Sequence, residues 1–185
     1  MNLILVRHGK TKESEKGVLL GSLPGNLSQE GKEQMKLVAQ EIKNKGMVPD
    51  IIISSDLKRT KDSATILSKE LGVKVIYNPL LRERKGGITE GKTENEINWD
   101  TYEQTPLLHR KHKGGESFVE VRERAKKFLD YLRSKKHNTV LIVSHSMFLA
   151  MLISLNKRIG IKKSLSTKFN ASIQLSIKQR RTRQI

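Results

Sequence analysis

The chain has 185 residues, a formal net charge of +17 and no cysteine, and only 4% of its residues are aromatic. This length fits one domain with a core of Leu, Ile and Val, and the lack of cysteine excludes disulfides, cysteine nucleophiles and thiolate metal sites. No apolar segment reaches the roughly 20 residues of a membrane span, and the apolar run at 3–6 is too short for a signal peptide, so we expect a cytoplasmic protein.

The first half of the chain alternates predicted strands with predicted helices. Apolar runs predict three strands, at 2–6, 50–53 and 73–77. Apolar residues at helical spacing predict a helix capped by Ser28 and a second helix at 57–71 that stops at Gly72. Asp56 precedes the second helix and is interpreted as its cap. The loop 9–27 leaves the first strand and is polar and glycine-containing, a setting that commonly carries function.

The middle of the chain, 78–115, is rich in charged residues and glycine. We predict it to be irregular, with one short helix near 92–99. A long helix then begins at Ser117, because Ser117 and Glu120 have the spacing of a capping box.

The last part of the chain adds a strand at 139–143, a buried helix that begins just after His145, and a half-buried strand at 171–177. We expect residues 1–178 to form one domain and residues 179–185 to be a basic, flexible tail. The alternation of strands and helices predicts a three-layer α/β/α fold around a mostly parallel sheet.

Polar residues follow three of the predicted strands at the point where each strand ends. Arg7 and His8 follow the first strand, Arg59 lies shortly after the second, and His145 follows the strand at 139–143. The ends of parallel strands meet at one edge of a sheet, where ligands of α/β proteins bind. A single histidine at a strand end is most often structural, but two such histidines with two arginines predict a functional site.

These residue types suit a tetrahedral phosphate dianion. Arg7 and Arg59 can each donate paired hydrogen bonds to phosphate oxygens. A protonated His145 would add positive charge. The helix that begins at Ser146 would direct its free N–H groups into the same pocket. We therefore assign Ser146 to the substrate-binding residues.

His8 is the predicted nucleophile. A backbone carbonyl such as that of Gly9 would hold its ring in one tautomer, so that it could attack phosphorus in line and form a phosphohistidine. The leaving oxygen needs a proton, and Glu83 in the loop 80–87 is a candidate donor. Asp56 and Glu116 are alternatives by charge alone. Taken without the other motifs, Glu83 among its basic neighbours is better interpreted as a solvated carboxylate.

Five ordered motifs resemble those of the histidine phosphatase superfamily, also called phosphoglycerate mutase-like. The motifs are Arg7-His8-Gly9 with Thr11, the segment 54–60, Leu81-Arg82-Glu83, the segment 114–117, and Val143-Ser144-His145. The resemblance covers residues 3 to about 177. It implies a phosphoglycerate mutase-like fold with a phosphorylated His8, a phosphoryl group bound by Arg7, Arg59 and His145, and Glu83 as proton donor. It also implies no metal and no organic cofactor.

The loop after the first motif departs from the family pattern. Many members have Glu or Gln where this chain has Lys10, and Asn where it has Ser14. The shorter Ser14 hydroxyl can still donate, so we assign Ser14 to the substrate-binding residues. An aromatic residue that the family usually carries near 86–87 is missing. These differences concern substrate preference more than phosphoryl chemistry.

The leading hypothesis is a phosphomonoester hydrolase acting on a small phosphorylated metabolite. A mutase of the same family is the alternative, although mutases are longer. Five basic residues could favour substrates with a second negative group: Lys10, Lys12, Arg82, Arg84 and Lys85.

A hypothesis of a different class rests on the charge. The segment 156–185 has nine Lys or Arg residues and no Asp or Glu, which suits a nucleic-acid binder with a vestigial pocket. No pattern of stacking aromatic residues supports that hypothesis, and a solubilising bias would explain the charge as well. The oligomeric state stays open.

Overall fold

Five strands form one sheet in the computed structural model, which describes residues 1–167, 169 and 172–177. The strand order is β3-β2-β4-β1-β5. The strands are β1 (Asn2–Arg7), β2 (Ile51–Ser54), β3 (Val75–Tyr77), β4 (Thr139–Ser144) and β5 (Ile173–Ser176). The first four run parallel, and β5 pairs antiparallel with β1 at the edge. The predicted mostly parallel sheet is confirmed.

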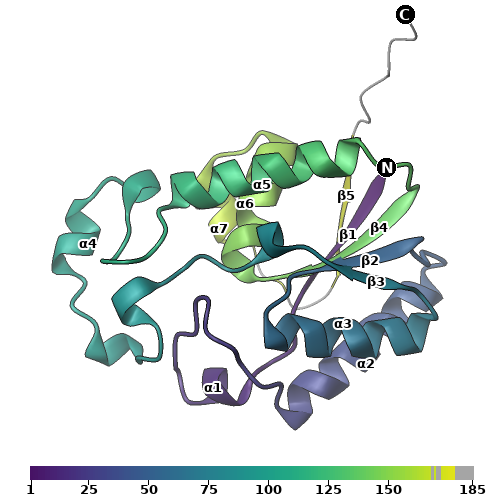
Figure 1. Ribbon diagram of the computed structural model, residues 1–185, viewed down its shortest axis with the longest axis horizontal. Coiled ribbons are helices and arrows are strands. Elements are labelled where there is room, and N and C mark those ends of the chain that lie inside the picture. Colours follow the sequence, from purple (N-terminus) through teal and green to yellow (C-terminus); the bar gives the residue numbers. More distant parts are fainter. Residues whose placement is uncertain (168, 170–171, 178–185) are drawn as a thin grey trace, which may run out of the picture.

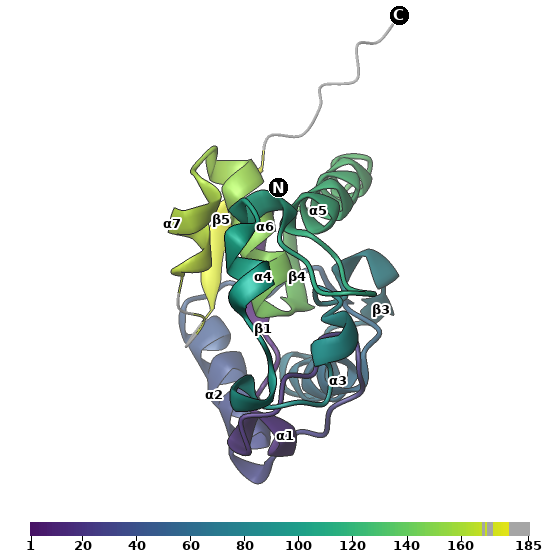
Figure 2. The same ribbon diagram turned by 90° about the vertical axis from the view of Figure 1, so that its left-hand side faces the viewer.

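Helices cover both faces of this sheet (Figures 1 and 2). On one face lie α2 (Gln29–Asn44) and α3 (Lys58–Leu71), and on the other lie α5 (Phe118–Arg133), α6 (Ser146–Lys157) and α7 (Ile161–Leu165). Side chains of β1 alternate between the two cores: Leu3 and Leu5 pack with α5 and α6, whereas Ile4 and Val6 pack with α2 and α3. This alternation follows from the period of two in a strand. The three-layer α/β/α architecture is therefore confirmed.

The register of the central strands places three chain segments at one edge. Arg7 at the end of β1 pairs with Ser144 at the end of β4, and Val143 pairs with Ser54 at the end of β2. Because all three strands run in the same direction, the residues that follow them emerge side by side. The predicted convergence of the strand ends is confirmed.

Helix starts follow the predicted caps in two cases and differ in one. Ser28 and Ser117 accept backbone N–H groups of α2 and α5, and Ser117 forms the predicted capping box with Glu120. The assignment of Asp56 as a cap is wrong. The cap position of α3 is Leu57, without a side-chain hydrogen bond, and Asp56 instead forms an ion pair with Arg82.

The connection between β3 and α5 differs from its predicted form. It holds three-residue 3₁₀ turns and one short helix: η1 (Pro79–Leu81), η2 (Gly87–Thr89), η3 (Glu94–Glu96), α4 (Asp100–Gln104) and η4 (Leu107–His109). The predicted helix near 92–99 is wrong, because a 3₁₀ turn occupies its centre and the helix begins at Asp100. Two short helices, α7 and α1 (Lys12–Glu15), were not predicted.

Two further predictions concern membrane-spanning segments and the C-terminal tail. None of the helices in the described ranges is long and apolar enough to cross a lipid bilayer. The proposed tail at 179–185 lies outside the described residues, as does Ala171 of the last predicted strand.

Candidate active site

Arg7, His8, Arg59 and His145 meet at the carboxyl edge of the sheet. The ring centroids of His8 and His145 are 5.2 Å apart. A cavity of about 640 Å³ opens over them and is lined by Arg7, His8, Arg59, Glu83 and Ser146, among other residues. His145 is fully buried behind this surface. Residues far apart in sequence thus form one site.

The two hydrogen bonds of His8 define its tautomer. Nδ1 lies 2.8 Å from the carbonyl oxygen of Gly9, and a carbonyl only accepts, so Nδ1 carries the proton. Arg59 Nε donates to Nε2 of His8 at 3.2 Å, which requires a lone pair on Nε2. Burial and the positive charge of Arg59 lower the pKa of His8 to about 3. His8 therefore presents a neutral, nucleophilic Nε2 at neutral pH.

The backbone around His8 is held by contacts with the start of α2. A Cβ added at Gly9 would lie 2.3 Å from the carbonyl oxygen of Gly31, and one added at Gly31 would lie 2.0 Å from that of Lys10. Only glycine permits this close approach. Gln34 of α2 also accepts the backbone N–H of Lys10. These contacts fix the carbonyl that sets the tautomer of His8.

Further contacts join the two ends of the first loop, residues 9–27, and we call these joined ends the neck of the loop. Thr11 and Leu27 form an antiparallel bridge. Two backbone hydrogen bonds flank the bridge, from Lys12 N to Asn26 O and from Ser28 N to Lys10 O. The loop leaves and returns at one place, beside His8.

Arg59 has a second role that the sequence did not indicate. Its guanidinium is buried, with 2% of the residue exposed. The two terminal nitrogens donate to the carbonyl oxygens of Leu23 and Gly21, both at 2.7 Å, while Nε faces His8. The predicted paired hydrogen bonds to phosphate compete with these contacts. Arg59 therefore ties the first loop to the nucleophile.

Glu90 joins the first loop, at Ser22, to the segment that begins at Gly86. One carboxylate oxygen accepts hydrogen bonds from the backbone N–H and the hydroxyl of Ser22 and from the backbone N–H of Gly86. Backbone hydrogen bonds also join Leu19 to Gly91 and Lys92. Together these contacts make the first loop and the segment 86–95 into one wall of the cavity.

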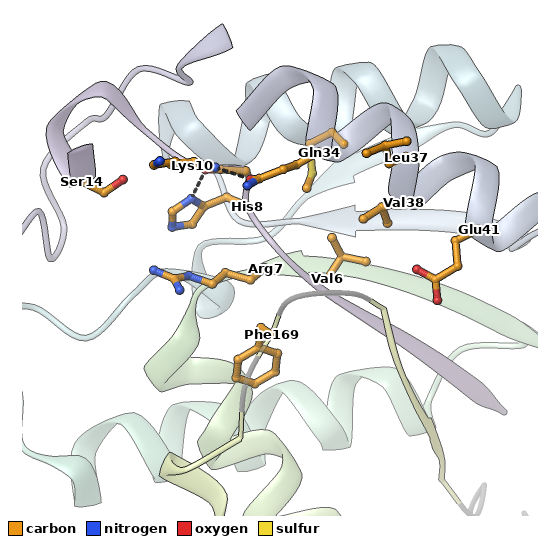
Figure 3. Close-up of a pocket in the computed structure, with 12 residues that line it drawn as sticks. Val6, Arg7, His8, Lys10, Ser14, Gln34, Leu37, Val38, Glu41 and Phe169 are labelled. Carbon is orange, nitrogen blue, oxygen red and sulfur yellow. Dashed lines mark hydrogen bonds between the residues drawn. The ribbon is translucent and has the colours of Figure 1, made fainter. Parts of the chain in front are cut away.

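Arg7 is a cation of the site without a charged partner in the described part of the chain. It is exposed at the end of β1, and among the described residues it forms no ion pair and no side-chain hydrogen bond. Figure 3 shows its guanidinium extending from the strand end on the same side as the His8 ring. A free guanidinium beside a nucleophile is suited to bind an oxyanion.

His145 is neutral, in contrast to the predicted protonated form. Burial lowers its pKa well below the usual value, and the charge of Arg59 adds to this effect. Nε2 of His145 lies 3.0 Å from the hydroxyl oxygen of Ser55. Nδ1 is buried and has no hydrogen-bond partner among the described residues. The positive charge of the substrate-free site thus comes from Arg7 and Arg59.

Glu83 lies at the amino end of α6. Its carboxylate accepts hydrogen bonds from the backbone N–H groups of Met147 and Phe148 and from the Ser146 hydroxyl, each at 3.3 Å. The predicted free N–H groups of this helix are therefore occupied by Glu83, and Ser146 contacts the carboxylate.

The loop that carries Glu83 is anchored from both sides. Arg124 of α5 donates to the carbonyl oxygens of Leu80 and Arg82, both at 2.7 Å. Ser144, next to His145, donates to that of Leu81 at 2.7 Å. The alternative acids do not line the cavity, because Asp56 pairs with Arg82 and Glu116 with Arg124.

Some of the polar and basic residues predicted to contact substrate line the cavity, and others do not. Ser14 lines the cavity, but its hydroxyl forms a capping box with Thr11, so its predicted contact with phosphate stays a prediction. Of the five basic residues singled out in the sequence, only Arg84 lines this cavity. Lys10 pairs with Glu30. Lys16, which the sequence did not single out, also lines the cavity.

A second cavity, of about 410 Å³, adjoins the site on the side of α2 (Figure 3). It shares Arg7, His8 and Ser14 with the first cavity but lacks Glu83. Its walls mix apolar residues such as Val38 and Phe169 with polar residues such as Gln34 and Glu41. No group of three or more His, Asp or Glu side chains suited to hold a metal occurs within the described ranges.

Comparisons with known proteins agree with this geometry. The sequence matches the family model of the histidine phosphatase superfamily (branch 1) over residues 3–183. It is 35% identical to phosphoserine phosphatase 1 of Hydrogenobacter thermophilus, over 80% of this chain and 72% of that protein. It is 32% identical to the probable phosphoglycerate mutase GpmB of Yersinia enterocolitica, over 83% of this chain and 74% of that protein.

Solved structures give the same result for the fold. A mycobacterial glucosyl-3-phosphoglycerate phosphatase in complex with VO3 matches with a TM-score of 0.81 and 26% identity, over 95% of this chain and 92% of that chain. The alpha-ribazole phosphatase of Shigella flexneri matches with a TM-score of 0.85 over 97% of this chain and 92% of that chain. At 23% identity it supports the fold alone.

Proposed function

The chain belongs to the histidine phosphatase superfamily, and on that basis we propose that it is a phosphomonoester hydrolase that acts on a small phosphorylated metabolite through a phosphohistidine intermediate. The observation that carries this proposal is the state of His8. Its ring is neutral, Nε2 holds the lone pair, and the cations Arg7 and Arg59 flank it.

In the first step, Nε2 of His8 attacks phosphorus and the ester P–O bond breaks. The hydrogen bond from Arg59 Nε to Nε2 is given up in this step, and Arg7 and Arg59 then stabilise the charge on the equatorial oxygens. Glu83 must carry a proton at this point, which it gives to the leaving oxygen. The position of Glu83 in the larger cavity supports this role, because the carboxylate that lines the smaller cavity, Glu41, is bound to Lys45 and to the hydroxyl of Ser172. The leaving group therefore extends into the larger cavity.

In the second step, a water molecule replaces the leaving group. The Glu83 carboxylate takes a proton from this water, whose oxygen attacks phosphorus. The P–Nε2 bond breaks, inorganic phosphate is released, and His8 returns to its neutral form. Protein cations neutralise the phosphoryl oxygens throughout, so we expect full activity in the presence of a chelator. We also place the enzyme in the cytoplasm, in keeping with a chain that lacks cysteine.

The substrate class is narrowed by two further cations. Lys16 and Arg84 line the cavity in addition to Arg7 and Arg59, and Lys16 has no ion-pair partner within the described part of the chain. We propose that substrates carry a second anionic group such as a carboxylate. The name of the relative phosphoserine phosphatase 1 fits this class.

Hydrolysis of p-nitrophenyl phosphate tests the reaction. We expect release of phosphate by the wild-type protein and by His109→Ala, whose position on η4 lies away from the cavity, but not by His8→Ala. Acid-labile, base-stable phosphate on the wild-type protein during turnover would identify the intermediate. Activity that survives in His8→Ala would refute the mechanism.

A second assay tests the substrate class. Lys16→Met should lower kcat/KM for phosphoserine much more than for p-nitrophenyl phosphate. Lys12→Met is the matched control, because Lys12 lies on α1, the short helix that ends just before Lys16, but does not line the cavity. Equal losses on both substrates would contradict the second anionic group.

The mutase alternative is kept because GpmB is named a probable phosphoglycerate mutase. A mutase would return the phosphoryl group from His8 to another hydroxyl of the same small molecule. Incubation with 3-phosphoglycerate distinguishes the two reactions, because a hydrolase releases inorganic phosphate whereas a mutase forms the 2-phospho isomer.

A further inference from the structure

Ser55 contacts the second histidine of the site. It follows β2, is fully buried, and its hydroxyl oxygen lies 3.0 Å from Nε2 of His145. A neutral imidazole carries one proton, on either of its two nitrogens. The contact with Ser55 decides which nitrogen of His145 holds it.

The hydrogen-bond partners of Ser55 favour one arrangement. Its oxygen accepts the backbone N–H of Leu57 at 3.3 Å, and among the described residues only His145 is left to accept its proton. If Ser55 donates to Nε2, the proton of His145 is on Nδ1. With the other tautomer, the Ser55 proton and the Nδ1 lone pair would both be buried without partners. The first arrangement leaves one unmatched group and the second leaves two, and each such group is costly.

The one unmatched group of the first arrangement is a donor, Nδ1–H of His145. It is buried and without a partner in the described structure, on a ring 5.2 Å from the ring of the nucleophile. A fixed donor beside a reacting centre stabilises an oxyanion without reorganisation. An oxygen of the transferred phosphoryl group would satisfy it.

We propose that Ser55 is a positioning residue whose hydroxyl donates to Nε2 of His145 and thereby holds His145 in the tautomer that presents Nδ1–H to the phosphoryl group on His8. The identity of the anion rests on the proposed function. The tautomer does not, because it follows from contacts of the substrate-free protein.

Nitrogen-15 NMR of histidine-labelled protein tests the tautomer directly. In the wild-type protein at neutral pH we expect a protonated Nδ1 and an unprotonated Nε2 for His145, the signals being assigned by their loss in His145→Gln. Added inorganic phosphate should shift the Nδ1 signal. A protonated Nε2 in the wild-type protein would overturn the proposal, whether or not the protein hydrolyses esters.

Variants of Ser55 test its effect on the reaction. Ser55→Ala should mix the two tautomers in the NMR spectrum and lower kcat/KM for p-nitrophenyl phosphate by about tenfold, less than the 10²- to 10³-fold typical for loss of a whole oxyanion donor. Ser55→Thr keeps the hydroxyl and should restore both readouts. Ser154→Ala is the matched control, because it removes another buried hydroxyl whose partner is the carbonyl of Ile159.

The outcomes separate this inference from the proposed function. A wild-type protein that hydrolyses esters through His8, with His145 protonated at Nε2, would keep the function and overturn the role of Ser55. A Ser55→Ala protein with an unchanged tautomer and unchanged kcat/KM would overturn it as well. An inactive wild-type protein with Nδ1–H on His145 would overturn the function and support the tautomer.

Discussion

Acidification should destabilise the protein through His8. The pKa of His8 is lowered from 6.5 to about 3, first by burial and then by the charge of Arg59. Between these values the unfolded chain binds a proton that the folded protein does not bind, and this favours unfolding. The stabilising contribution of the neutral ring is therefore complete above about pH 6.5 and is lost as the pH falls toward 3.

The linkage relation gives the size of this effect. For pKa values of 6.5 unfolded and about 3 folded, lowering the pH from 8 to 4.5 removes about 2.7 kcal/mol of stability. The ring is half-buried rather than fully enclosed, which reduces the expected value to about 2 kcal/mol through solvent screening. The variant His8→Asn has no imidazole at this position and should not show this part of the loss.

Urea unfolding at pH 8 and pH 4.5 measures the effect. His145 and the carboxylates titrate in both proteins, so the difference between the pH dependences of wild type and His8→Asn isolates His8. We expect wild type and the control variant His109→Asn to lose about 2 kcal/mol more than His8→Asn over this range. Equal losses in all three proteins would refute the neutral state of His8, and with it the tautomer argument.

Three other changes have expected outcomes. Arg59→Ala should lower kcat/KM by about 10²- to 10³-fold. It should also expose the segment 17–25 to limited proteolysis, because Arg59 no longer holds the carbonyls of Gly21 and Leu23. Unchanged protease resistance would argue against this role of Arg59. Glu83→Gln should slow alkyl phosphate esters much more than phenyl esters, because a phenolate leaves without a proton; equal losses would contradict its role as acid. Gly31→Ala should reduce the free energy of unfolding by about 1–3 kcal/mol because its Cβ would meet a backbone carbonyl. Gly160→Ala, which meets no atom within 4 Å, is its control, and equal stability of the two variants would contradict the close approach.

The convergence of the strand ends was predictable from sequence because it depends on local pattern and one topological rule. Apolar runs that stop at Arg7-His8 and at Ser144-His145 identify buried strands, and parallel strands share an edge. The tautomer of His8 was predictable for a similar reason, since the carbonyl of Gly9 is adjacent in the chain.

Other features of the site depend on contacts between segments that are far apart in the sequence, and local sequence patterns do not predict such contacts. Asp56 has the side chain of a helix cap, but Arg82 approaches it from another segment and binds it. The charge of His145 depends on complete burial beside Arg59, which its position in the chain does not reveal. The segment 78–115 has no apolar periodicity to fix its short helices, so their positions were mispredicted.

The closed neck of the first loop has a consequence for how such a protein can change. Thr11 and Leu27 form an antiparallel bridge, and Gly9 packs closely against Gly31. Residues 12–26 therefore form a loop segment whose two ends are fixed. Changes in that segment that keep the contacts of the Gly21 and Leu23 carbonyls with Arg59 need not displace His8, because the two ends of the segment stay fixed. New substrates could therefore be acquired by exchange of a surface segment, while the machinery that transfers phosphate is inherited unchanged.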